Sequence, residues 1–231
     1  MGLGAIQAND SLPGVAMPTS HRTALPLGLL LGLALPFGLA TPALSQEETN
    51  EEAARAVFAA GCFWCVEEAF DPVDGVLRTI SGYSGGDVED PSYQQVVEGD
   101  TGHAEVVSVE YDPEVVSYDT LLHVFWRNVD PFAEDRQFCD VGSSYRSAIF
   151  YRNEEEREMA TETRDALEER FGRDIATEIV PFEAFYPAED YHQNYYQENP
   201  VRYRFYKSAC GRQERLEDVW GDEAGGLGSA H

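Results

Sequence analysis

Hydrophobic and polar positions alternate along residues 46–220 with two different periods, which predicts interleaved strands and helices. Short apolar runs and period-two alternation predict strands, whereas apolar residues spaced three or four apart predict helices. The predicted strands are 56–60, 76–80, 104–111, 145–151 and 176–180, and the predicted helices are 62–70, 92–98, 118–128, 153–170 and 213–219. No repeat or linker interrupts this order, so the pattern favours one α+β domain over residues 46–220.

The chain changes character after Phe182, where it becomes aromatic and irregular up to the last predicted helix. Residues 221–231 are rich in glycine, and we expect this tail to be disordered. Asn153 has Glu156 three residues later, a spacing typical of a helix start, and it supports the long charged helix that follows.

The first 45 residues have the pattern of a secretory signal peptide with an over-long N-terminus. Residues 25–39 form an uncharged apolar run of about 15 residues, which is shorter than the roughly 20 needed to span a bilayer. Arg22 precedes this run, and the small residues Ala43 and Ser45 occupy the −3 and −1 positions of a cleavage site before Gln46. Met17 is a natural start for such a peptide. The sequence therefore predicts an exported, periplasmic protein.

The charge of the chain excludes some classes of partner. Forty-two acids against sixteen Lys and Arg residues give a formal net charge of −26. Nucleic acid is bound by basic surfaces, and so are anionic membranes. The hydrophobic content of 43% is too high for a disordered acidic chain. We therefore expect a folded acidic protein that binds neither nucleic acid nor, after cleavage, a membrane.

Candidate chemistry is concentrated at residues 61–65, where a predicted strand gives way to a helix. Gly61 permits a sharp turn, and Cys62 then lies where unpaired N–H groups and the helix dipole favour a thiolate. Such positions lower the pKa of a cysteine and make it nucleophilic. Phe63 and Trp64 are suited to binding a small apolar group. Cys62-x-x-Cys65 has no second closely spaced pair, so we expect no metal.

Glu105 is a candidate general acid because of its place in the predicted strand 104–111. Strict alternation puts it on the same face as Val107 and Val109, which is the more apolar face. Burial there would raise the pKa of the carboxyl and keep it protonated near neutral pH. An exposed acid at the end of the strand is the alternative that the pattern leaves open.

Several motifs together resemble the peptide methionine sulfoxide reductase A family over residues 57–196. They are GCFW at 61–64, SGYSGG at 81–86, PSY at 91–93, GDTGHAE at 99–105, YDP at 111–113, DVGSSYRS at 140–147 and AEDYHQ at 188–193. The resemblance implies a two-layer α/β sandwich. In that fold a ferredoxin-like core of mixed sheet and helices is wrapped by a long C-terminal coil.

The resemblance also implies an activity and roles for individual residues. Cys62 matches the nucleophile that attacks the sulfur of methionine sulfoxide, in proteins or as the free amino acid, and the S epimer is implied. Glu105 matches the acid that protonates the departing oxygen. Tyr93 and Tyr145 match the phenols that hydrogen-bond this oxygen, which is a strong acceptor. The implied biological role is the repair of oxidised proteins.

Further residues match the substrate pocket of the family. Phe63 and Trp64 match the residues that receive the substrate methyl group, and Asp140 matches a polar residue of the same pocket. The resemblance implies a thioredoxin-type reductant and no metal or organic cofactor, because the electrons pass through thiols. Export implies a periplasmic thioredoxin-like carrier, and we expect a monomer.

The resolving cysteine is where the sequence departs from the commonest family pattern. Many members have glycine after the tryptophan and resolving cysteines in a glycine-rich tail, whereas here Cys65 follows Trp64 and the tail has no cysteine. Three resolving cysteines are open. Cys210 lies where the first one of the family falls and is favoured, Cys65 is at i+3 from Cys62, and Cys139 precedes a pocket residue.

The CxxC pair also supports a rival hypothesis, a periplasmic thiol–disulfide oxidoreductase that uses Cys62 and Cys65. That hypothesis leaves Glu105 and the two tyrosines without a role. A second rival is a binding domain stapled by disulfides, since four cysteines in an exported chain allow three pairings. It predicts that no thiol is reactive.

Overall fold

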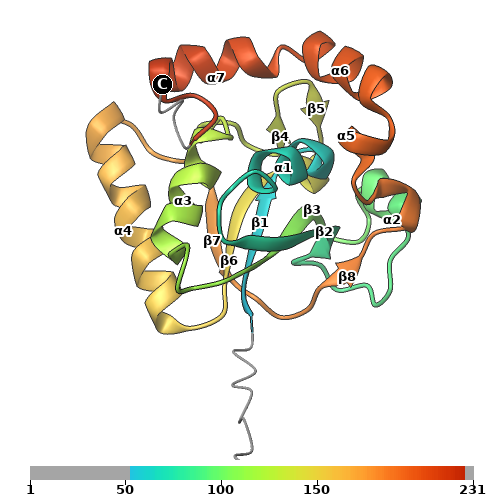
Figure 1. Cartoon of the computed structure of the whole chain (residues 1–231), viewed down its shortest axis with the longest axis horizontal. Coiled ribbons are helices and arrows are strands. Elements are labelled where there is room, and N and C mark those ends of the chain that lie inside the picture. The colour runs from blue at the N-terminus through green and yellow to red at the C-terminus, as the bar shows by residue number, and fades with distance from the viewer. Residues whose placement is uncertain (1–52, 227–231) are drawn as a thin grey trace, which may run out of the picture. The chain divides into compact units, whose positions relative to one another are not determined.

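A six-stranded mixed sheet forms the centre of the protein, whose computed structural model describes residues 53–226. The predicted signal peptide lies outside the described residues. The strands follow the order β7-β6-β1-β3-β2-β8, and only the β6–β7 pair is parallel (Figure 1). The strands are β1 (Ala54–Ala60), β2 (Val76–Ser84), β3 (Ala104–Tyr111), β6 (Ser147–Tyr151), β7 (Glu178–Pro181) and β8 (Tyr186–Pro187).

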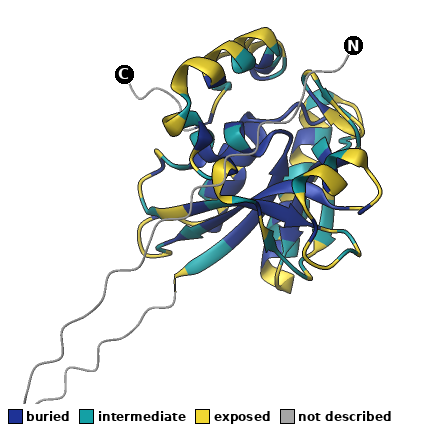
Figure 2. Ribbon diagram, turned by 90° about the vertical axis from the view of Figure 1, so that its right-hand side faces the viewer, coloured by how far each residue is buried: buried dark blue, intermediate teal, exposed yellow. Residues whose placement is uncertain are grey.

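Helices cover one face of this sheet and bury most of its apolar side chains. The α-helices are α1 (Phe63–Phe70), α2 (Tyr93–Glu98), α3 (Tyr118–Arg127), α4 (Glu154–Phe171), α5 (Tyr195–Glu198), α6 (Pro200–Ala209) and α7 (Arg212–Trp220). Phe58 of β1 stacks on Phe70 of α1 and Phe125 of α3 in this core. On the opposite face Val57 and Val106 are covered by Phe182 and Phe185. The central strands are therefore buried on both faces (Figure 2), and the predicted α+β sandwich is confirmed.

Several boundaries differ from the sequence prediction. β2 continues four residues beyond Ile80, where the predicted strand ends. The strand predicted from Tyr145 starts at Ser147, because residues Ser143–Tyr145 form a 3-10 helix. A small hairpin, β4 (Arg136–Gln137) and β5 (Asp140–Val141), was not predicted, since two-residue strands are too short to show a period.

The C-terminal segment is more helical than the expected coil. The sequence did not predict α6, because its apolar residues do not form one stripe that faces the core. Tyr203 is buried, whereas Val201 and Phe205 are exposed. Residues 221–226 of the tail that we expected to be disordered belong to the described residues, and Gly221–Glu223 form a 3-10 helix. Glu223 in this stretch forms ion pairs with Arg127 and Arg170, which hold it against α3 and α4.

Polar contacts between residues far apart in sequence attach the C-terminal segment to the core. The Gln193 side chain accepts a hydrogen bond from the Ser81 N–H at 3.0 Å and donates to the Ser81 carbonyl at 2.9 Å. Asn194 N–H donates to the buried carboxylate of Glu67 on α1, at 3.0 Å. These contacts place residues 192–206 over the N-terminal end of α1.

Gly61 is required at the turn from β1 into α1. Its φ is +79°, and an added Cβ would lie 2.6 Å from Cβ of the fully buried Gln137. Gly61→Ala is therefore expected to destabilise the fold by about 2 kcal/mol or more, from backbone strain and overpacking together. Chemical denaturation measures this loss. Gly172→Ala is the control, because its φ is +64° with nothing within 4 Å, and a loss at Gly61 no larger than at Gly172 would contradict the packing argument.

Candidate active site

Cys62 lies at the junction where β1 ends and α1 begins. It is the N-cap residue of α1, and only 6% of its surface is exposed. The Phe63 N–H, which follows it, donates a hydrogen bond to Glu105 Oε2 at 3.0 Å. The first turn of α1 therefore brings the predicted nucleophile and the predicted acid to the same place.

Glu105 is buried near the start of β3, as the alternation of that strand predicts. Its side chain is directed toward the layer of helices, and only 1% of the residue is exposed. Burial raises the pKa of its carboxyl to about 8, against the opposing effect of the hydrogen bond from Phe63. A carboxyl with this pKa is mostly protonated at neutral pH, which is the state that a proton donor needs.

Cys65 contacts Cys62 from the next position of the same helical face. The Cys62 thiol donates a hydrogen bond to Cys65, and this bond is the main reason that the pKa of Cys65 falls to about 6. The cations Arg212 and Lys207 and the Tyr203 hydroxyl act in the same direction. In the reduced protein Cys65 is therefore the first of the two thiols to lose its proton as the pH rises.

The prediction that the helix N-terminus lowers the pKa of Cys62 is wrong for this state. Burial raises that pKa, and the neighbouring Cys65 and Glu105 raise it further. The sequence pattern could not reveal this, because the Phe63 N–H that would stabilise a thiolate already donates to Glu105. Cys62 becomes a better nucleophile when the charge on Cys65 is neutralised.

Two phenols lie next to the carboxyl. The hydroxyls of Tyr93 and Tyr145 are hydrogen-bonded to each other, and the charge of Glu105 acts on both. Burial and this carboxylate raise the pKa of Tyr93 to about 12 and raise that of Tyr145 as well. Both phenols therefore remain protonated and available as donors to an oxygen bound between them and Glu105.

Aromatic rings surround the same site. Phe63 and Trp64 follow Cys62 on α1, and Trp64 stacks on Tyr195 with ring centres 3.8 Å apart. His192 joins this cluster and was missed as a site residue, although its motif was recognised. The Trp64 indole donates to His192 Nδ1 at 3.1 Å, and burial lowers the pKa of His192 to about 4, so the imidazole is neutral.

Tyr206 links Asp140 to the Cys62 thiol. The sequence did not indicate Tyr206 as a site residue. The Tyr206 hydroxyl lies 2.5 Å from Asp140 Oδ2 and is also hydrogen-bonded to Cys62. Burial raises the pKa of Asp140, against the opposing effects of Tyr206 and Arg212. Only the fold of the C-terminal segment brings Tyr206 here, so no local pattern could have identified it.

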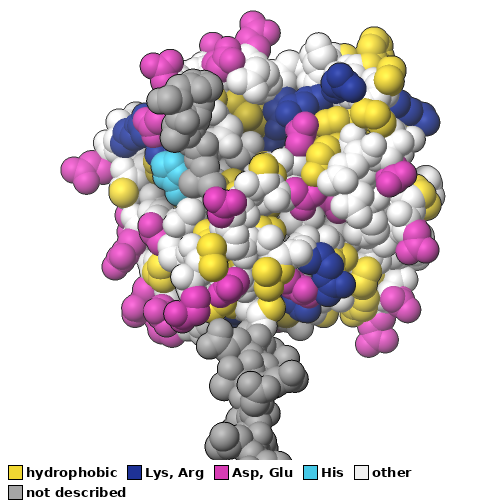
Figure 3. Space-filling model, viewed as in Figure 1, with side chains coloured by type: hydrophobic (Ala, Val, Ile, Leu, Met, Phe, Trp, Pro, Cys, Tyr) yellow, Lys and Arg dark blue, Asp and Glu magenta, His cyan; other side chains and the backbone are white. Residues whose placement is uncertain are grey.

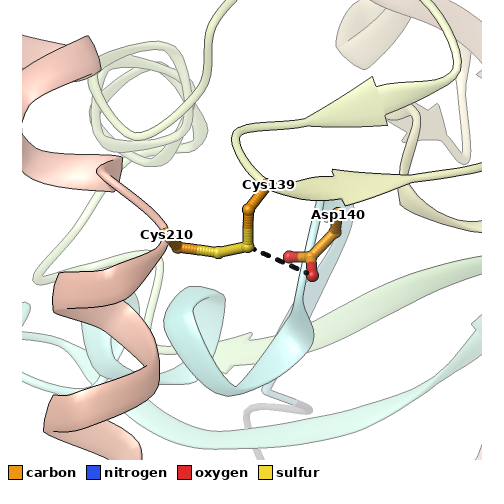
Figure 4. A group of neighbouring side chains, drawn as sticks. All are labelled: Cys139, Asp140 and Cys210. Atoms are coloured by element: carbon orange, nitrogen blue, oxygen red, sulfur yellow. Dashed lines mark hydrogen bonds between the residues drawn. A yellow bond between two sulfur atoms is a disulfide. The ribbon is translucent and has the colours of Figure 1, made fainter.

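The four cysteines form two pairs. Cys62 and Cys65 are free and buried, whereas Cys139 and Cys210 form a disulfide between the β4–β5 hairpin and the end of α6 (Figure 4). The structure thus places Cys210, the favoured resolving cysteine, next to Cys139, and places Cys65 next to Cys62.

Within residues 53–226, one group of side chains has the spacing of metal ligands, namely Cys139, Asp140 and Cys210. Two of its three ligands are joined in the disulfide, so the group does not fit a metal while that bond is present. In the same range, no helix has both the length and the hydropathy of a membrane span.

The arrangement supports one kind of chemistry. Two thiols in contact can supply two electrons and become a disulfide. A neutral carboxyl and two phenols can hydrogen-bond an oxygen that gains negative charge, and the aromatic rings favour a small apolar group beside it. Together with the α+β fold, this defines a thiol-dependent reductase.

Comparison with known proteins identifies the family. Residues 54–224 match the family described as peptide methionine sulfoxide reductase. A peptide methionine sulfoxide reductase MsrA of Halalkalibacterium halodurans is 47% identical over 169 residues, which cover 72% of this chain and 96% of that protein. The MsrA 2 of Rhizobium meliloti is 44% identical over 198 residues, covering 86% of this chain and 96% of that protein.

Solved structures show the same similarity. Reduced Mxr1 from Saccharomyces cerevisiae superimposes with a TM-score of 0.61 at 33% identity, covering 64% of this chain and 86% of that one. Methionine sulfoxide reductase A of Corynebacterium diphtheriae gives 0.60 at 32% identity, covering 66% and 78%. The chain belongs to the peptide methionine sulfoxide reductase family. It is an oxidoreductase that reduces methionine sulfoxide and uses its cysteines as the source of electrons.

Proposed function

We propose that this enzyme reduces the S epimer of methionine sulfoxide through Cys62, with Glu105 as the proton donor. The observation that carries the proposal is the buried contact between the N-terminal turn of α1 and Glu105, whose pKa of about 8 keeps it protonated at neutral pH. Preference for the S epimer is taken from the resemblance to the family. Both oxidised proteins and free methionine sulfoxide are candidate substrates.

The first half of the reaction transfers one oxygen atom. Cys62 sulfur attacks the sulfoxide sulfur while Glu105 protonates the oxygen, and Tyr93 and Tyr145 hydrogen-bond that oxygen as it gains charge. Cys62 leaves this step as a sulfenic acid, and methionine is released. The proton that Cys62 loses restores Glu105, so atoms and charge balance.

The substrate methyl group contacts the aromatic residues that follow the nucleophile. Phe63 and Trp64 form this part of the site in our proposal, and Asp140 supplies its polar edge. Support comes from the rings of Phe63, Trp64 and His192, which lie within 4.9–6.5 Å of one another. An apolar group gains free energy by leaving water for such a surface.

Cys65 is the resolving cysteine in our proposal. It is the cysteine that contacts Cys62, and its pKa of about 6 makes it a thiolate at neutral pH. This thiolate attacks the Cys62 sulfenic acid, a disulfide forms and water leaves after protonation. Cys210, which the sequence favoured, is paired with Cys139.

The change Cys65→Ser is expected to stop recycling and to keep the first reaction. One equivalent of methionine per chain should still form, because removal of Cys65 removes a group that raises the pKa of Cys62. The Cys62 sulfenic acid should then persist, and dimedone labelling followed by mass spectrometry detects it. A disulfide from Cys62 to Cys139 or Cys210 in this variant would contradict the assignment of Cys65.

The same variant separates this proposal from the rival CxxC thiol–disulfide oxidoreductase. The observation that favours the rival oxidoreductase is the pKa of Cys65, which at about 6 resembles that of a reactive CxxC thiol. A simple CxxC enzyme loses all activity without Cys65 and reduces no sulfoxide. A reductase of our type keeps a single turnover.

The reductant and the compartment are also part of the proposal. A thioredoxin-like protein reduces the Cys62–Cys65 disulfide, without a metal or an organic cofactor. The protein is exported to the periplasm and acts there as a monomer in the repair of oxidised proteins. The apolar run at 25–39 and the small residues Ala43 and Ser45 support export.

The proposed function is tested with two synthetic peptides, each of which carries one epimer of methionine sulfoxide. Reduced protein and excess dithiothreitol are added, and mass spectrometry follows the loss of one oxygen. We expect the S epimer to be converted and the R epimer to remain. Conversion of neither epimer would exclude the function, and conversion of R alone would exclude the stated specificity.

A further inference from the structure

The Cys139–Cys210 disulfide lies at the protein surface, beside the proposed active site. It joins the β4–β5 hairpin to the C-terminal end of α6, with 4.9 Å between the two Cα atoms (Figure 4). Cys139 is exposed, whereas Cys62 and Cys65 are 6% and 4% exposed. Another protein can therefore reach the sulfur of Cys139 more easily than either sulfur of the active pair.

Close contacts connect this disulfide with the active pair. Cys139 Sγ lies 3.7 Å from Asp140 Oδ1, and the Tyr206 hydroxyl bridges the other Asp140 oxygen to the Cys62 thiol. A cavity of about 190 Å³ is lined by Cys65 together with Lys207 and Arg212, which flank Cys210 in the sequence. The residues next to the disulfide therefore contact Cys62 through Asp140 and Tyr206, and others of its sequence neighbours line a cavity together with Cys65.

α6 presents an unusual surface next to this disulfide. Val201 and Phe205 are 80% and 77% exposed, and they lie one turn apart on the same side of the helix. Exposed Ser208 and Ala209 continue this side toward the end of α6, where Cys210 follows. We call Val201, Arg202, Arg204, Phe205 and Ser208 the α6 face.

The charge of the α6 face is opposite to that of the chain as a whole. No acid occurs between Asn199 and Gln213, although the chain carries a net charge of −26. Arg202 and Arg204 are exposed and form no ion pair within the described part of the chain. In Figure 3, Lys and Arg side chains gather beside hydrophobic ones at the upper right, where Figure 1 places α6.

We propose that Cys139–Cys210 is the disulfide through which an external protein dithiol delivers electrons, and that this dithiol docks on the α6 face. The partner chemistry that fits is a dithiol framed by apolar side chains and carboxylates. The proposal rests on the proposed function, because it supplies the electrons that the Cys62–Cys65 disulfide requires. Charge complementarity with an acidic partner would favour encounter, and the apolar pair would supply contact area.

The electrons would move in two exchanges. A thiolate of the partner attacks Cys139 Sγ, and the Cys139–Cys210 bond breaks with Cys210 as the leaving thiolate. The second partner thiol then releases Cys139, so the partner leaves as a disulfide. Opening this bond also frees the end of α6 from the hairpin.

The second exchange returns the active pair to its reduced form. The Cys210 thiolate attacks Cys65 Sγ, and the Cys62–Cys65 bond breaks with Cys62 as the leaving thiolate. Cys139 then attacks Cys210, the surface disulfide re-forms and Cys65 is released as a thiol. Two electrons pass in each exchange, and the net change is oxidation of the partner dithiol and reduction of the Cys62–Cys65 disulfide.

The test compares two reductants on the same enzyme. Turnover of the S epimer peptide is measured with thioredoxin, its reductase and NADPH, and separately with dithiothreitol, which is small enough to reach Cys65 directly. In the double variant C139S/C210S, the ratio of thioredoxin-supported to dithiothreitol-supported turnover is expected to fall by about tenfold or more. An unchanged ratio would show that the disulfide is only a structural cross-link.

A second variant keeps the test decisive if the double variant does not fold. Phe205→Asp is expected to raise the KM for thioredoxin by about tenfold or more while dithiothreitol-supported kcat is retained. Val115→Asp, at a residue that is 61% exposed elsewhere, is the matched control and should leave the KM unchanged.

The remaining outcomes separate the inference from the proposed function. An unchanged KM for thioredoxin in Phe205→Asp overturns the docking surface. If sedimentation shows that this variant converts a dimer to a monomer while the KM stays unchanged, the docking surface is also overturned. The α6 face would then bind a second copy of this chain. Wild-type protein that reduces neither epimer with dithiothreitol would instead contradict the proposed function itself.

Discussion

Cys62→Ser is expected to abolish the reduction of methionine sulfoxide, by about 10⁴-fold or more. A hydroxyl is a weak nucleophile toward sulfur, and serine cannot accept the oxygen as a sulfenic acid or form a disulfide. Because the side chain is small and buried at the N-cap of α1, serine fits the same space and can cap the helix. Liquid chromatography of the peptide product measures the loss in both single-turnover and dithiothreitol-supported assays.

Cys65→Ser is the matched control for this substitution. Both changes replace a buried sulfur in the first turn of α1, and only the loss of Cys62 removes the proposed nucleophile. The control should form one equivalent of methionine, and the Cys62 variant none. If the Cys62 variant forms one equivalent while the control forms none, the two roles are reversed.

Glu105→Gln is expected to slow the reduction by about 10²–10⁴-fold. Glutamine has the same shape and its side-chain oxygen can still accept the Phe63 N–H, so α1 and β3 stay in place. What is lost is the proton that the departing oxygen needs. Single-turnover rates under saturating substrate measure the effect on the chemical step.

The reduction rate is also expected to depend on pH in a definite direction. The pKa of Glu105 is raised to about 8, so its protonated form is present below that pH and is lost above it. The wild-type single-turnover rate should therefore fall as pH rises through about 8. In Glu105→Gln that decline should be missing, because the amide does not titrate.

Glu67→Gln is a control for the general effect of neutralising a buried glutamate. Glu67 is also fully buried, burial raises its pKa to about 7, and it accepts a hydrogen bond from Asn194 rather than from the α1 N-terminus. We expect this variant to keep the wild-type rate. Equal losses in the Glu67 and Glu105 variants would refute a specific role for Glu105.

The sequence was sufficient for the parts of the site that depend on local pattern. The change from a strand to a helix at Gly61 placed Cys62, and the alternation in β3 placed Glu105 on the buried face. Both elements are long enough to show their period, and each residue follows from its position within a single element. The capping interaction of Asn153 with the Glu156 N–H was predictable for the same reason.

The rest of the site depends on contacts between distant residues. His192 and Tyr206 reach Trp64 and Cys62 because Gln193 binds Ser81 and Asn194 binds Glu67, which are more than 100 residues away in the chain. No periodicity records such contacts. The pairing of Cys139 with Cys210 is likewise one of three arrangements that the spacing of four cysteines allows.

The state of the thiols shows how burial can oppose a local rule. A helix N-terminus stabilises a thiolate when its N–H groups are free and the sulfur is near water. Here Cys62 is buried, and Glu105 accepts the first of those N–H groups. The charge consequently lies on Cys65, where Arg212 and Lys207 favour it.

The most direct measurement of the central claim is the mass of the protein after a single turnover without external reductant. Fully reduced protein is mixed with the S epimer peptide, free thiols are alkylated, and the digested chain is mapped. We predict one methionine per chain and a new disulfide between Cys62 and Cys65. Methionine formation with both of these thiols still free, or no methionine at all, would contradict the account.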